Sequence, residues 1–363
     1  AAPGLGGVGT QGMIGSYFAG NRVGFTSVID RGVAAMGPPS SPPRPEGKWN
    51  VEWKAAWYLR ELRVAGADVW FGARGAGVRM EEGQLRGFAV TTPWGAGLVE
   101  ATVSVDASGS ATLAAAAGAP VSIVGSDHVA VQGSGLGPRE LAAHNRNTDW
   151  TFVDDGDPGD QTRAFVAARS KWKGEFDVAQ IVDMRERRRI LAEYDLDILD
   201  ILAGRTFPDT IAMARAPYET HGFTIHPLFM ALPPPPKEDM ILSPIPLRSL
   251  LPRGVEGLLV AGLGLGAHRD ALPVIRMQPD VQNIGWAAGL CALWAAQKTA
   301  GRVRSVPVRE LQRALVAGGT IPSELLRQED SFPVSYEDLA LAVASGPVTH
   351  RSLALVFSDP RKS

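Results

Sequence analysis

Three of the six histidines lie where a proton acceptor would be useful. His268 sits in a glycine-dense turn, and His221 and His226 share an aromatic and polar segment that begins at Tyr218. Imidazole titrates close to neutral pH, so it can take a proton from a hydroxyl or amine group at working pH. A lone histidine is more often a structural hydrogen-bond partner. We therefore rank His268 first as a catalytic base, then His221 and His226, with Tyr218 as an assisting group.

Two arginines follow His268 and suit a polar ligand. Arg269 and Arg276 could hold an anionic substrate group or neutralise a reduced cofactor. The acidic cluster at 154–160 suggests a cation, but its spacing misses the EF-hand pattern, so a solvated loop is the better interpretation. No Cys/His spacing suggests zinc or iron–sulfur, and the single Cys291 excludes an internal disulfide. We expect no metal.

The segment 258–289 would position these side chains. It reads as a buried strand, a glycine-dense turn and a helix that begins near Pro279. Glycines let the backbone approach a ligand closely, and the start of a helix offers free N–H groups to an electron-rich group. The candidate ligand-binding residues of this segment are Ala261, Gly262, Asn283, Ile284 and Gly285.

Several motifs carry a resemblance to a known family. The sequence resembles the FAD-dependent oxidoreductases of the glutathione-reductase-like superfamily, most strongly over 246–262, and the resemblance continues through Arg276, Pro279 and 285–289. Residues 105–114 are similar to the family's Ala-Thr-Gly motif, with serine in place of threonine. Residues 5–10 resemble the glycine pair after the second strand of its nucleotide-binding fold. Segments at 187–194 and 202–209 resemble the helix and loop of its inserted domain.

This resemblance implies an α/β protein with FAD as its cofactor. It implies a Rossmann-like FAD-binding domain, incomplete in this chain, with an inserted α+β substrate domain. The resemblance also implies contacts to FAD at Arg74 and Gly75, on the strand expected to pass the adenine. It implies further backbone contacts to FAD at Gly6, Gly7, Val8, Thr10, Ala107, Ser108 and Gly109.

The sequence departs from the family in two places. The family opens with a strand, a Gly-x-Gly-x-x-Gly turn and a second strand that ends in an acidic residue, which together hold the pyrophosphate and ribose. The glycines at 4–9 follow no strand, so they do not match this fingerprint. We expect an N-terminal FAD-binding polypeptide, cleaved or separately encoded, or a boundary of the sequence itself to explain this; loss of FAD is the third explanation. The second departure is His268-Arg269, where the family has a Ser/Thr-His pair.

The changes in composition along the chain predict four regions. Residues 1–123 form the first part of the FAD-binding domain and 124–250 the substrate domain. Residues 251–300 return to the flavin side, and 301–363 form a helical tail. We expect helices at 48–65, 111–117, 175–203, 308–316 and 335–344, and strands from 69, at 85–92 and at 99–106.

Composition narrows the function further. The net charge of −2 gives no basic excess for nucleic acid, and no apolar stretch is long enough for a membrane span. We expect a cytoplasmic, oligomeric oxidase or dehydrogenase that moves hydride from a CH–OH or CH–NH group of a small polar substrate to flavin. The alternatives are a flavin-dependent C–C reductase or desaturase, and a flavin-free binding subunit.

Overall fold

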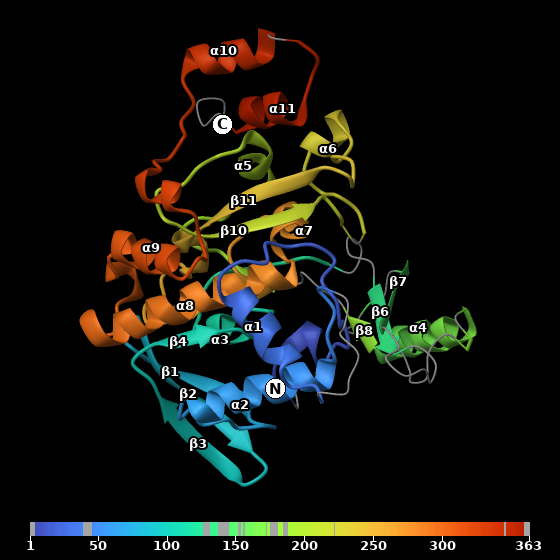
Figure 1. The fold of residues 1–363 in the computed structure, drawn as a ribbon, viewed down its shortest axis with the longest axis vertical. Coiled ribbons are helices and arrows are strands. Elements are labelled where there is room, and N and C mark those ends of the chain that lie inside the picture. Colours follow the sequence, from blue (N-terminus) through green and yellow to red (C-terminus); the bar gives the residue numbers. More distant parts are fainter. Residues whose placement is uncertain are drawn as a thin grey trace.

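The computed structural model describes residues 4–38, 46–125, 131–136, 145–151, 154, 157–171, 173–174, 181–183, 188–220, 222–344 and 346–358. For residues 131–136, 145–151, 168 and 181–183 only the backbone is described. Figure 1 shows a mixed α/β body, with an antiparallel sheet at its lower end and the C-terminal helices at its upper end. The mixed α/β class agrees with the prediction.

A short parallel strand pair lies in the middle of the chain's fold. Strand β4 (Ser104–Asp106) runs beside β12 (Leu258–Val260), with Leu258 opposite Ser104. All three residues of β12 are buried, as expected for a parallel strand that is covered on both faces. The strand predicted after residue 257 is therefore confirmed.

The sheet at the lower end of Figure 1 is a meander of β1 (Arg74–Glu81), β2 (Gln84–Thr92) and β3 (Gly95–Glu100). Gly83 takes a φ of 78° in the first hairpin turn, a conformation that glycine adopts without strain. Two predicted bounds were wrong. The strand expected from residue 69 begins only at Arg74, after a turn, and the strand expected over 99–106 is divided between β3 and β4.

The largest hydrophobic core joins a second ribbon to the longest helix. Strands β10 (Thr210–Pro217) and β11 (Met240–Pro246) pair antiparallel, and β10 lies against helices α7 (Leu272–Ile275) and α8 (Gln278–Lys298). Figure 1 shows α8 crossing between this ribbon and the lower sheet. Buried side chains that hold these elements together include Ile211, Ile245, Leu259, Val274 and Ile284.

An aromatic stripe formed by Trp49, Trp53 and Trp57 is the packing surface of the helix predicted over 48–65. Helix α2 (Val51–Val64) begins after Asn50, whose side chain accepts the N–H groups of Glu52 and Trp53. Trp49 and Trp57 are buried against α1 (Phe25–Ala34), a helix that the sequence did not predict.

The helix predicted over 175–203 was wrong. Within the described part of that range lie β8 (Ile181–Asp183), β9 (Arg188–Ile190) and only a short helix, α5 (Ile198–Ala203). Strand β9 pairs antiparallel with β5 (Val121–Ile123), and this pairing buries Ile190, which had been assigned to a helix face. Asp197 forms a capping box with Asp200, so α5 cannot begin earlier.

The remaining elements complete the chain. Helices α3 (Thr112–Ala116), α9 (Val308–Ala317) and α10 (Tyr336–Ala344) confirm predicted helices, whereas α11 (His350–Phe357) was not predicted. No helix in the described ranges combines the length and apolarity that a bilayer crossing requires. The other elements are η1 (Gly7–Gly9), β6 (Val131–Leu136), β7 (Asn145–Thr151), α4 (Pro158–Lys171), α6 (Leu228–Ala231), η2 (Leu247–Leu250), η3 (Gly262–Gly264), η4 (Arg269–Ala271), η5 (Val303–Ser305) and η6 (Ser323–Arg327).

Candidate functional site

The carboxyl ends of β4 and β12 meet at one edge, where open α/β sheets bind ligands. Asp106 ends β4 and organises the loop that follows. One of its carboxylate oxygens accepts the N–H of Ser108 at 3.0 Å, and the other accepts those of Leu113 at 2.8 Å and Ala114 at 3.0 Å. The buried carboxylate therefore both closes the loop at 107–111 and caps helix α3.

The turn after β12 packs against this loop. The N–H of Ala261 donates to the carbonyl of Asp106 at 2.9 Å. A methyl group on Gly264 would lie 2.8 Å from the backbone nitrogen of Ala111, so the two turns can approach this closely only with glycine there.

Two other glycines leave open backbone at the same edge. Gly109 and Gly262 have φ values of 79° and 75°. A methyl group on Gly109 would meet no atom within 4 Å, and one on Gly262 would meet only Val281, at 3.8 Å. The backbone at these two glycines is open to close approach, which fits a flat, extended cofactor that contacts the main chain.

Helix α8 points its first turn toward the same region. Its N-cap is Met277, which supplies no side-chain cap, and the N–H of Val281 makes the first helical bond, to the Met277 carbonyl. The free N–H groups at the helix start thus belong to Gln278 and Asp280, since Pro279 has none.

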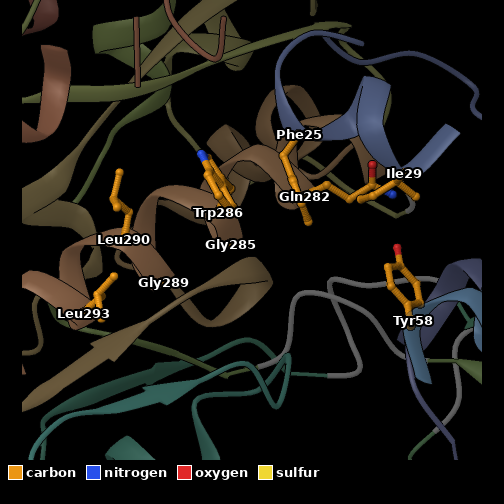
Figure 2. A pocket seen from close by; sticks show the side chains of 9 residues that line it. All are labelled: Phe25, Ile29, Tyr58, Gln282, Gly285, Trp286, Gly289, Leu290 and Leu293. Atoms are coloured by element: carbon orange, nitrogen blue, oxygen red, sulfur yellow. The ribbon is translucent and has the colours of Figure 1, made fainter. Parts of the chain in front are cut away.

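This start corrects the predicted backbone donors. Asn283, Ile284 and Gly285 fall in the second turn, where their N–H groups bond inside the helix. Asn283 instead donates through its side chain to the Asn21 carbonyl at 3.2 Å, and Ile284 is buried in the core. Gly285 lines a hollow that α8 forms with α1 and α2 (Figure 2).

The glycine motif near the N-terminus lies beside the start of α8. It forms η1, with Gly6 at a φ of 92° before it and Thr10 buried after it, while Val8 is partly exposed. The Gly9 carbonyl accepts the indole N–H of Trp49 at 2.8 Å. Gln278, the first residue of α8, reaches back to the Ile14 carbonyl at 3.4 Å. Gly7 has a φ of 52°, and a methyl group there would meet no atom within 4 Å.

Two predicted cofactor residues lie further out. Arg74 and Gly75 occupy the exposed start of β1. Only later residues of that strand, Val78 and Met80, pack near α3.

A histidine pair lies just after the β12 turn. His268 and His226 meet edge to face, with ring centroids 5.3 Å apart. Nδ1 of His268 accepts the N–H of Asp270 at 3.2 Å, and Nδ1 of His226 accepts that of Leu228 at 3.1 Å. Nε2 of His226 lies 3.8 Å from a carboxylate oxygen of Asp197.

These contacts fix the resting state of His268. Burial lowers the pKa of His268 below its ordinary value, although the charges of Asp197 and Asp270 act in the opposite direction. The ring is therefore neutral at neutral pH. Because Nδ1 accepts a backbone N–H, the ring proton sits on Nε2. His268 can accept a substrate proton at Nε2 once its own proton moves to Nδ1, in exchange for the Asp270 bond.

A fully buried ion pair lies next to the histidine pair and bonds to the main chain of His226. Arg269 and Asp270 are both completely buried, and their charged atoms lie 3.0 Å apart. Arg269 also bonds the Thr220 hydroxyl. Asp270 accepts the N–H groups of Ile225 at 2.8 Å and His226 at 2.7 Å. Arg269 was predicted to hold an anionic substrate group or to neutralise the reduced cofactor; in the structure its side chain is fully buried against Asp270 and Thr220.

The other predicted catalytic residues have different outcomes. Arg276 is partly buried and donates to the Glu219 carbonyl at 2.9 Å. Tyr218 is buried with its ring 5.1 Å from that of Phe229. His221 lies outside the described residues.

Comparison with known proteins identifies the class of enzyme. Residues 150–315 match the family model described as FAD dependent oxidoreductase. The match covers less than half of the chain and supports an oxidoreductase enzyme. FAD is its cofactor, and the matched range includes β12, the histidine pair and α8. A comparison with curated proteins gives no match.

Similar solved structures are distant. A geranylgeranyl bacteriochlorophyll reductase-like protein from Thermoplasma acidophilum has 13% identity and a TM-score of 0.39, and the match covers 89% of this chain and 76% of that one. OxyS anhydrotetracycline hydroxylase from Streptomyces rimosus has 14% identity and a TM-score of 0.40, with 96% and 63% covered. BexE has 16% identity and a TM-score of 0.33, with 85% and 58% covered.

Sequence reasoning missed three acidic residues and one lysine of this region. Asp106 was only seen as the end of a strand, and Asp197 and Asp270 were not singled out. Asp270 directly follows His268-Arg269, which was the available signal. Lys54 lies between tryptophans of the aromatic stripe, and nothing in its neighbours indicates that its amine is buried.

Proposed function

We propose that this oxidoreductase removes hydride from a CH–OH or CH–NH group of a small polar substrate. FAD, when bound, supplies the acceptor for the hydride and its two electrons. The residues of this chain bind the cofactor through open backbone at Gly109 and Gly262, and handle the proton of the substrate's oxygen or nitrogen.

The observation that carries this proposal is the arrangement of His268. Its Nδ1 is held by the Asp270 N–H, its pKa is lowered by burial, and its ring lies against His226 just after the β12 turn. A neutral histidine beside a cofactor cradle suits the removal of a proton as hydride leaves carbon, once the Asp270 bond is released and Nε2 is free to accept the proton. The carboxylate of Asp197 lies 3.8 Å from His226 Nε2, and its charge favours a proton taken up by His268.

An anaerobic reduction experiment tests the reaction. The complete gene product is loaded with FAD and mixed with small alcohols, polyols, amines and amino-acid derivatives, each with and without deuterium at the carbon to be oxidised. Loss of the yellow flavin absorbance that deuterium slows supports hydride removal from that carbon. A protein that stays colourless after FAD is added contradicts the proposal.

One observation favours a second candidate, C–C bond reduction or desaturation by the same flavin. Phe223 is 61% exposed and Ile225 is 38% exposed, and both lie close in sequence to His226. Such exposed apolar side chains suit a hydrophobic substrate. Flavin that is reduced by a nicotinamide donor and reoxidised by an unsaturated compound would favour this candidate.

We also propose that a glycine-rich N-terminal polypeptide, cleaved or separately encoded, completes the FAD site. Two observations support it. Parallel sheets are normally larger than two strands, yet β4 and β12 pair only with each other among the described strands. A hollow of about 420 Å³ lies along α8, lined by apolar and small side chains, including Trp286 at 40% and Leu293 at 50% exposed (Figure 2).

Purification of the complete gene product tests this partner. Mass spectrometry should detect a glycine-rich segment bound to the chain, and Trp286→Glu should release it together with FAD. Retention of FAD by this chain alone, with no such segment present, contradicts the proposal.

A further inference from the structure

Lys54 is a buried amine for which the fold provides no hydrogen bond. The residue is 2% exposed, and its Nζ has no hydrogen-bond partner among the described residues. Buried polar groups are nearly always paired, and an unpaired amine is expensive to bury. We therefore expect a bound group that accepts a hydrogen bond from this amine.

Aromatic rings form the walls around the amine. Nζ lies 3.6 Å from the ring centroid of Trp49 and 5.1 Å from that of Tyr17. Ring faces attract a cation, but they accept no conventional hydrogen bond from it. The two rings hold the amine in place but leave its N–H donors without an acceptor.

The nearest carboxylate is already engaged. Asp30 affects Lys54 only through its charge, and burial dominates, lowering the pKa of Lys54 to about 7. One oxygen of Asp30 accepts the Tyr17 hydroxyl at 2.8 Å, and the other accepts Arg22 at 3.0 Å. The protein thus supplies Arg22, and not Lys54, as the counter-ion of Asp30.

The amine reaches the glycine turn beside the start of α8. A methyl group on Gly9 would lie 3.4 Å from Lys54 Nζ and would collide with the side chain of Gln278, the first residue of α8. The unpaired amine, the η1 turn at Gly9 and the uncapped helix start at Gln278 therefore lie together. All three favour an electron-rich group.

We propose that Lys54 is the cationic contact of this protein to the flavin ring of FAD at the start of α8. This inference rests on FAD binding as part of the proposed function. When the ring is reduced it becomes more negative, and a nearby ammonium group stabilises it more than it stabilises the oxidised ring. Lys54 would then act on the cofactor, whereas His268 acts on the substrate.

Two variants and a matched control test the contact. Lys54→Met keeps the apolar stem and removes the charge, whereas Lys54→Arg keeps the charge. Lys298→Met removes a lysine from the opposite end of α8, where it pairs with Glu310. We expect Lys54→Met to prefer reduced over oxidised FAD about tenfold less strongly than the wild type does. This change lowers the reduction potential of the two-electron couple by about 30 mV. Lys54→Arg and Lys298→Met should stay near the wild-type potential.

A measurement on the wild-type protein does not depend on how the variants fold. Lysines labelled with ¹³C at Cε are titrated by NMR without and with FAD, and the Lys54 signal is assigned as the one missing from Lys54→Arg. The midpoint should lie near neutral pH without FAD and rise when FAD binds. An unchanged midpoint, or a Lys54→Met potential equal to that of Lys298→Met, overturns the inference and leaves the flavin reaction standing. A protein that binds no FAD overturns both.

Discussion

His226 and His268 lie edge to face with ring centroids 5.3 Å apart, although 41 residues separate them in the sequence. Each ring is held by a backbone N–H at Nδ1, from Leu228 and Asp270 respectively. The buried carboxylate of Asp270 also accepts the N–H of His226. Asp270 therefore holds the His268 ring through its N–H and the His226 main chain through its carboxylate.

Replacing His268 by asparagine tests its role as a base and keeps a side chain that can cap η4. Asparagine is a good N-cap, so the side-chain oxygen in His268→Asn can still accept the Asp270 N–H, but the variant lacks Nε2. We expect the rate of flavin reduction by substrate to fall by roughly 10²–10⁴-fold, with little change in thermal stability. Stopped-flow absorbance and calorimetry measure the two quantities.

The control for this variant is His350→Asn, which alters a partly exposed histidine that contacts the Pro233 carbonyl. It should reduce flavin at the wild-type rate. Wild-type kinetics in His268→Asn would remove His268 from the reaction.

The buried pair of Arg269 and Asp270 should be strongly coupled. Asp270→Asn leaves the Arg269 charge buried without its carboxylate, so we expect a loss of about 3–5 kcal/mol in the free energy of unfolding. Arg269→Met combined with Asp270→Asn should be less destabilised than the sum of the single variants. Urea denaturation of all three variants measures this coupling, and strictly additive losses would show that the pair does not interact.

Asp280 should make stability depend on pH. Burial raises its pKa to about 7, although the N–H groups of Asn21 and Arg215 act against this rise. Between about pH 4 and 7 the folded protein keeps a proton that the unfolded chain has lost, so this group stabilises the fold most at low pH. Its contribution falls as pH rises toward 7, by an amount on the order of 4 kcal/mol.

Asp280→Asn should remove this slope. The unfolding free energy of wild type minus that of the variant, followed by urea denaturation from pH 4 to 8, should fall as pH rises. A difference that is constant over this range would show that Asp280 titrates normally.

The single cysteine should be unreactive in the folded state. Cys291 is fully buried in α8, and burial raises its thiol pKa to about 12. Fewer thiolates form, so alkylation by iodoacetamide near pH 8 should be slower on the order of a thousandfold than in urea-unfolded protein. Mass spectrometry after timed alkylation measures this ratio, and equal rates would contradict the buried placement.

Local patterns predicted the elements that carry their own signals. The apolar run of β12, the proline near the start of α8 and the tryptophan spacing of α2 all depend on neighbouring residues, and these elements were confirmed. The predicted helix start near Pro279 agrees with the observed start at Gln278. The free N–H groups were nevertheless assigned to 283–285, one turn too late, and not to Gln278 and Asp280.

Long-range contacts explain why the other features were not predicted from the sequence. Residues 188–190 resemble a helix face alone, but pairing with β5 makes them a strand. The burial of Arg269 depends on Thr220 and Asp270 together. Lys54 is buried because Trp49 and Tyr17 close over it, and its sequence neighbours give no sign of that. His226 and His268 were both selected as candidates, but their contact required the folded chain.

The antiparallel pairing of β5 with β9 has a consequence for how this protein can change. The chain leaves β5 at Ile123 and re-enters at Arg188, which is the residue opposite it. Figure 1 shows β6, β7, β8 and α4 to one side of the main body. Because exit and re-entry are neighbours, the intervening stretch can be exchanged as one cassette, by recombination or by grafting, while the histidine pair and the β4–β12 edge keep their places.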